Sequence, residues 1–69
     1  MRVFEVQKDG KQYCAIQLIE DRRVKTTLTT PSLWRMKETL LRTNPGFKIA
    51  SNTSKDHNVW VIVLEEVNP

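Results

Sequence analysis

The stretch VWVIVL, residues 59–64, decides the fold of this 69-residue chain. All six residues are apolar, and most are β-branched or aromatic, which is typical of a β-strand. Strand side chains alternate between two faces, so the three valines point to one side and Trp60, Ile62 and Leu64 point to the other. A strand with no polar member should be covered on both faces. We therefore place this strand at the centre of a sheet and expect something to cover each face.

The chain before and after this stretch predicts four further strands and one helix. Asp9-Gly10 is a typical centre for a two-residue hairpin turn, and Glu20-Asp21-Arg22-Arg23 reads as a second, polar turn. A polar loop is expected at residues 53–58. The five strands are predicted at residues 2–8, 12–19, 24–29, 47–52 and 58–66.

The helix is predicted between residues 31 and 43. Thr30 is a suitable N-cap, and Pro31 suits the first helical position because its missing N–H would have no partner there. The sequence Asn44-Pro45-Gly46 ends the helix. The spacing places apolar side chains along one stripe, made by Leu33, Met36 and Leu40 and widened by Trp34 and Leu41.

These elements predict a single α+β domain over residues 1–69, in the order β-β-β-α-β-β. The sheet should be mainly antiparallel, with two sections joined through the helix. We expect the helix to pack on the face that carries Phe4, Val6, Ile16 and Leu18, with Cys14 on that same core face. One helix covers only one face of a sheet, so we expect the other face to be covered by part of the sheet curling over it, by a second copy of the chain or by another partner. Of these we predict a homodimer.

Composition limits the class of protein. The formal charge is +3, which is a mild bias, and the isoelectric point is about 9.4. Cys14 is the only cysteine, so the chain can form no internal disulfide. There is no signal-like apolar segment at the start and no apolar run near the length of a membrane span. We expect a soluble cytoplasmic protein that does not enter a membrane.

Catalytic and cofactor signatures are weak. His57 is the only histidine and falls in a predicted loop, whereas Cys14 falls on a predicted core face, so they are not expected to form a nucleophile and base. A metal site lacks further ligands, and both glycines lie in turns, so no phosphate-binding loop is expected. The sequence therefore predicts a protein that is not an enzyme and has no cofactor or metal.

Nucleic-acid binding is the first functional hypothesis. Cations near the predicted turns could neutralise phosphates of DNA or RNA, and a tyrosine between them could stack on a base. Alternatively, lysines and arginines in turns only keep the surface soluble and protect strand edges. The residues predicted to bind nucleic acid in a regulatory role are Lys8, Lys11, Tyr13, Arg22, Arg23 and Lys25.

Protein binding is the second hypothesis. A short cytosolic chain without catalytic residues also suits a modulator or inhibitor of the kind that phages and mobile elements encode, which blocks a site on a larger protein. An apolar sheet face would make this contact, and its predicted residues are Tyr13, Ala15, Ile19 and Trp60. The sequence does not decide between DNA, RNA and a protein partner.

Overall fold

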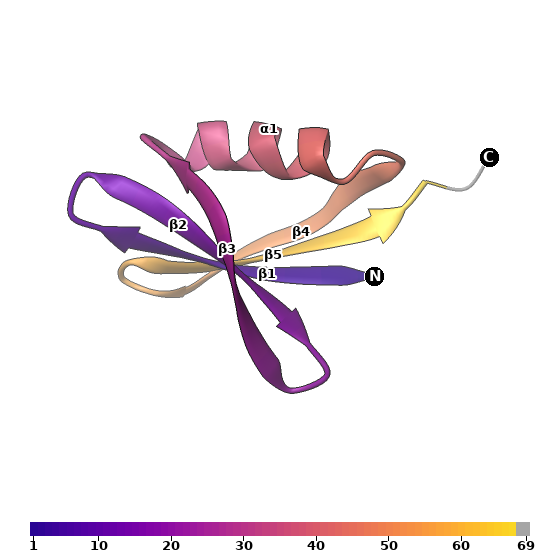
Figure 1. Cartoon of the computed structure of the whole chain (residues 1–69), viewed down its shortest axis with the longest axis horizontal. Helices are drawn as coiled ribbons and strands as arrows, with labels where there is room; N and C mark the ends of the chain where they lie inside the picture. Colours follow the sequence, from indigo (N-terminus) through magenta and orange to yellow (C-terminus); the bar gives the residue numbers. More distant parts are fainter. Residues whose placement is uncertain (68–69) are drawn as a thin grey trace.

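The computed structural model describes residues 1–67 and has the predicted element order (Figure 1). Five antiparallel strands form one sheet, and one helix packs on one of its faces, which confirms the α+β class. The elements are β1 (Arg2–Asp9), β2 (Gln12–Ile19), β3 (Arg22–Thr30), α1 (Leu33–Thr43), β4 (Phe47–Asp56) and β5 (Val59–Glu66).

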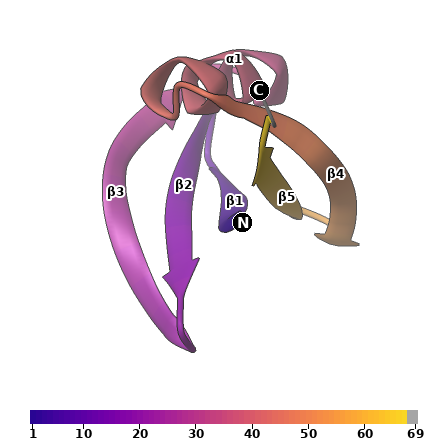
Figure 2. The ribbon, with the colours of Figure 1, turned by 90° about the vertical axis from the view of Figure 1, so that its right-hand side faces the viewer.

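The sheet has the strand order β3-β2-β1-β5-β4, so β1 lies at its centre (Figure 2). The β1-β2-β3 meander and the β4-β5 hairpin are joined through α1, and β1 pairs with β5. The prediction that β5 is central was wrong by one position. An apolar strand needs a neighbour on each edge, and β5 has these in β1 and β4 without being the middle strand.

The hairpin turns differ from prediction by one or two residues. Asp9 pairs with Gln12, so Gly10 and Lys11 form the first turn, and Gly10 has the positive φ of 64° that a type II′ turn requires at this position. The second turn contains only Glu20 and Asp21, whose φ angles are 45° and 66°, and β3 therefore begins at Arg22. The predicted loop at 53–58 is also shorter, because β4 pairs with β5 as far as Asp56.

The helix-covered face carries Phe4 and Val6, as predicted, but not Ile16 and Leu18. A two-residue turn pairs residue i with residue i+3, so even-numbered residues of β1 must lie opposite odd-numbered residues of β2. Val6 accordingly lies opposite Ala15, and both belong to the core. Ile16, Leu18 and Cys14 lie on the face away from α1, and their assignment to the core face was wrong for this reason.

The helix begins two residues later than predicted. Ser32 is the N-cap, and its side chain accepts a hydrogen bond from the Arg35 backbone N–H at 3.1 Å. Thr30, the predicted cap, is instead the last residue of β3; it is buried and its hydroxyl donates to the Ser32 carbonyl at 2.7 Å. Thr30 thus fixes the connection between the sheet and α1 without capping the helix.

The packed side of α1 is narrow. Met36 and Leu40 are fully buried against the apolar residues of β1 and β5, whereas Trp34 is 64% exposed and Leu41 is 38% exposed. The prediction that Trp34 and Leu41 widen the buried stripe was therefore wrong. The helix ends at the buried Asn44, whose amide donates to the Leu40 carbonyl at 2.7 Å. Among residues 1–67, no helix has the length and apolar character needed to cross a membrane.

Candidate functional site: the uncovered face of the sheet

The face of the sheet opposite α1 (Figure 2) carries aliphatic side chains around one central carboxylate. Three residues of β1 lie opposite partners on β2 and β5, so nine side chains form three rows. Most of the nine are half-buried, because neighbours across the strands shield one another. We call this surface the open face, and it consists of Val3, Glu5, Gln7, Cys14, Ile16, Leu18, Val59, Val61 and Val63.

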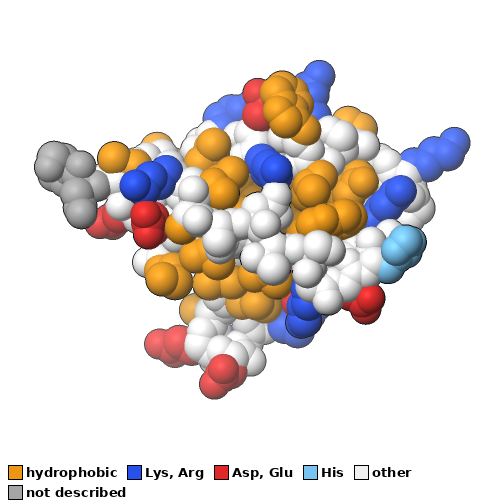
Figure 3. All heavy atoms as spheres, turned by 180° about the vertical axis from the view of Figure 1, so that it is seen from behind, with side chains coloured by type: hydrophobic (Ala, Val, Ile, Leu, Met, Phe, Trp, Pro, Cys, Tyr) orange, Lys and Arg blue, Asp and Glu red, His pale blue; other side chains and the backbone are white. Residues whose placement is uncertain are grey.

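Hydrophobic groups are visible on both sides of the polar edge strand β4 (Figure 3). In this view from behind, they gather above and below a pale band of polar and backbone atoms. The upper group lies toward α1, and the lower group lies on the side away from α1. The apolar character of the open face therefore extends to the molecular surface.

Glu5 lies at the centre of the open face and is only 3% exposed. It stands between Ile16 and Val61 in the middle row. Its Oε1 accepts from Arg23 Nη2 at 2.9 Å and from Gln7 Nε2 at 2.8 Å, while Lys55 Nζ lies 3.5 Å from Oε2. Arg23 comes from edge strand β3 and Lys55 from edge strand β4, so the two cations reach the same carboxylate from opposite edges of the sheet.

These contacts keep Glu5 ionised. The hydrogen bond from Arg23 is the main reason that the pKa of Glu5 falls from 4.5 to about 2; burial opposes this change, and Gln7 and the charge of Lys55 assist it. The same pair raises the pKa of Arg23. A carboxylate with so low a pKa is a poor proton donor or acceptor near neutral pH. Glu5 is therefore suited to positioning charges and not to acid–base chemistry.

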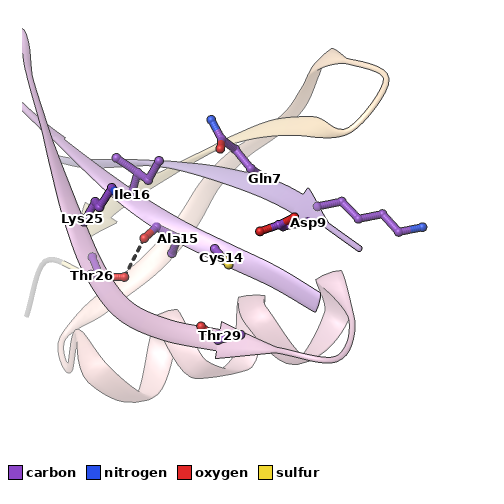
Figure 4. A pocket seen from close by; sticks show the side chains of 9 residues that line it. Gln7, Asp9, Cys14, Ala15, Ile16, Lys25, Thr26 and Thr29 are labelled. Carbon is purple, nitrogen blue, oxygen red and sulfur yellow. Dashed lines mark hydrogen bonds between the residues drawn. The ribbon is translucent and has the colours of Figure 1, made fainter. Parts of the chain in front are cut away.

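A cavity of about 420 Å³ adjoins the open face where β3 bulges away from β2 (Figure 4). Cys14 pairs with Thr29 and Ile16 pairs with Lys25, so β3 has two extra residues here. The Thr26 hydroxyl bridges the bulge by donating to the Ala15 carbonyl at 2.6 Å and accepting from the Leu28 N–H at 3.1 Å. The cavity is lined by Gln7, Lys8, Asp9, Cys14, Ala15, Ile16, Lys25, Thr26 and Thr29.

The structure divides the basic residues predicted to bind nucleic acid. Lys8 and Lys25 line the same cavity, and Lys11 lies in the β1-β2 turn next to it. Arg22 and Arg23 lie beside the β2-β3 turn, at the opposite end of the sheet (Figure 1). Arg23 also pairs with Glu5. The six predicted residues therefore do not form one continuous basic surface.

The aromatic and apolar residues predicted to form an interface lie on the α1 side of the sheet. The rings of Tyr13 and Trp60 are half-buried and packed together, with centroids 5.6 Å apart. Ala15 is 1% exposed and belongs to the core, whereas Ile19 is 43% exposed at the end of β2. Of these four, only Ile19 is largely accessible to a partner.

The sequence did not lead us to predict the contact between Glu5 and Lys55. The available signal was a carboxylate between Phe4 and Val6 in the middle of β1, where burial would call for a partner. Lys55 could not be found in this way, because it was assigned to a loop. The register of β4 against β5 was needed to place it on the sheet.

The histidine and the cysteine belong to different elements of the fold. His57 lies in the turn between β4 and β5, and Cys14 lies on β2. Among residues 1–67, no three histidine, cysteine or acidic side chains are grouped as a metal site. No family model, curated protein or solved structure matches the chain.

Proposed function

We propose that this chain is a small non-enzymatic binding protein whose open face docks onto another protein. The observation that carries the proposal is the group of aliphatic side chains around Glu5, on the sheet face that lies away from the one helix of residues 1–67. Apolar surface that also carries polar and charged groups is typical of protein–protein interfaces. Such a protein acts by occupying a site on its target, as a modulator or inhibitor does.

Charge placement makes nucleic acid the second candidate. Phosphate recognition requires cations along one path, but Lys11 and Arg22 lie at opposite ends of the sheet, and Arg23 is already paired with Glu5. Tyr13 is half-buried and packed against Trp60, which limits the ring surface that could stack on a base. In favour of DNA or RNA, Lys8 and Lys25 line one cavity and form no ion pair among the described residues.

The proposal is tested by polar substitutions of similar shape on the open face. Val61→Thr combined with Val63→Thr should abolish capture of the target from cells that express the chain, because hydroxyls would be buried in the interface without partners. The matched control is Val24→Thr, at a valine that is 42% exposed and lies on the α1 side of the sheet. Thermal unfolding of each variant checks that it folds.

Two results would contradict protein docking by the open face. One is a target captured equally by the double variant and by the wild type. The other is tight binding to oligonucleotides that weakens steeply with salt and is lost in Lys8→Ala with Lys25→Ala, which would favour nucleic acid.

A further inference from the structure

We infer that the outer edge of β4 pairs with the β4 strand of a second copy of this chain, so that two sheets join into one. This contact does not use the open face, and the inference therefore goes beyond the proposed function. The reasons are the accessible backbone of β4, the direction of its two lysines and the order of charges along it.

β4 presents a long, accessible strand edge. β3 and β4 are the outer strands of the sheet (Figure 2), and an outer strand has backbone N–H and C=O groups that no neighbouring strand satisfies. Residues 50–56 of β4 are all exposed. Between two irregularities, residues 51–54 pair with β5 in an unbroken register and carry only short polar side chains. The outer side of this segment is therefore open to another strand.

The two lysines of β4 do not protect this edge. A lysine that extends outward from an outer strand hinders pairing with another chain. Lys48 instead pairs with Glu65 of β5 at 3.4 Å, and Lys55 pairs with Glu5 of β1 at 3.5 Å. Both carboxylates belong to strands inside the sheet, so both ammonium groups are drawn inward. β4 also contains no proline that would interrupt pairing.

The opposite edge of the sheet, β3, is better protected. Two extra residues between Lys25 and Thr29 interrupt its pairing with β2. Arg22 and Lys25 form no ion pair among residues 1–67, so their charges can repel a second basic strand. Bulges and charged side chains are both devices that prevent pairing at an edge. β4 is therefore the edge that accepts a further strand.

The charges of β4 are placed symmetrically about Asn52. Lys48, Asn52 and Asp56 pair with residues 65, 62 and 59 of β5, so three positions of the register separate Asn52 from each charged residue. The two charges are opposite in sign, and both residues lie on the open-face side of the sheet. This order of charges fits an identical strand that runs in the opposite direction.

A twofold axis through Asn52, perpendicular to the sheet, brings these charges together. The axis sets Ser51 opposite Thr53 of the second copy, and Lys48 opposite Asp56 of the second copy. Two contacts between a cation and a carboxylate then flank a centre of short polar side chains. Both helices lie on one side of the joined sheet and both open faces on the other, so each open face keeps its access to a partner.

The test is sedimentation equilibrium of the purified chain over a range of concentrations. We expect the wild type to approach twice its mass of 8.1 kDa as the concentration rises. Asn52→Lys sets two lysines against each other at the axis and should raise the dissociation constant at least about tenfold. The matched control is Thr27→Lys, which adds the same charge at an exposed position of β3 and should leave the dimer unchanged. Thermal unfolding checks that both variants fold.

Disulfide trapping tests the position of the axis. Asn52→Cys should link two copies under mild oxidation, because opposite residues of antiparallel strands have Cα atoms about 4.5–5.5 Å apart. Thr27→Cys should give little linked product. The wild type, whose only cysteine is the half-buried Cys14, serves as the second control.

The outcomes separate this inference from the proposed function. A wild type that stays monomeric at about 1 mM, or a dimer that Asn52→Lys leaves intact, would overturn the inference and leave the proposed function in place. A dimer that Val61→Thr with Val63→Thr dissociates would place the second copy on the open face and overturn both. Target capture that Asn52→Lys abolishes, with a monomeric wild type, would assign the edge of β4 to a strand of the target instead.

Discussion

The ionised Glu5 at the centre of the open face should make stability depend on pH in a defined way. Its pKa is 4.5 in the unfolded chain and about 2 in the folded protein, so the unfolded state binds more protons between these values. The stabilisation by Glu5 is therefore complete above the unfolded pKa and is lost as pH falls toward the folded pKa. A shift of this size corresponds to at most about 3 kcal/mol, and the solvent around the half-exposed cations reduces it to about 1–2 kcal/mol.

Glu5→Gln isolates this contribution, because every other carboxylate is unchanged. Urea unfolding followed by tryptophan fluorescence would give the free energy of unfolding of both proteins at several pH values. The advantage of the wild type should be largest near pH 6 and should shrink by about 1–2 kcal/mol on going to about pH 2. An advantage that stays constant over this range would refute the buried ion-pair account of the open face.

Two predictions concern the fold that supports this face. Glu20→Asn with Asp21→Gly should stabilise the protein by about 1 kcal/mol and raise Tm by roughly 4–8 °C. Both native residues have positive φ angles in a two-residue turn, a conformation that Asn-Gly favours. A lower Tm would contradict that turn geometry. Leu40→Ala should cost about 2–5 kcal/mol in urea unfolding, whereas Trp34→Ala, at a 64% exposed site, should change stability by less than about 0.5 kcal/mol. Similar losses at both positions would contradict the observed helix orientation.

The order and type of the elements could be predicted because each has a local cause. Alternation in β1, turn residues at positions 9–10 and 20–21, and the apolar spacing of α1 are all visible in the sequence. The turn boundaries could not be predicted from local sequence. Gly10 can serve as either residue of a two-residue turn, and the choice depends on which residues pair across the strands.

The candidate site depended on long-range register, which the sequence does not display. Arg23 was assigned to a turn and Lys55 to a loop, and only strand pairing brings both to Glu5, which is 18 residues from one and 50 from the other. The face assignment failed for a related reason, since Ile16 and Leu18 look like core residues when considered alone. Apolar character predicts contact, but not which face makes it.

The most direct measurement is photo-crosslinking from inside the open face. Benzoylphenylalanine would replace Val61, and in a second protein Leu41 on the exposed side of α1, in cells that express the chain. We expect position 61 to crosslink to a protein target and position 41 to form no crosslink. Crosslinks from position 41 alone, or from position 61 to nucleic acid and not to protein, would contradict it.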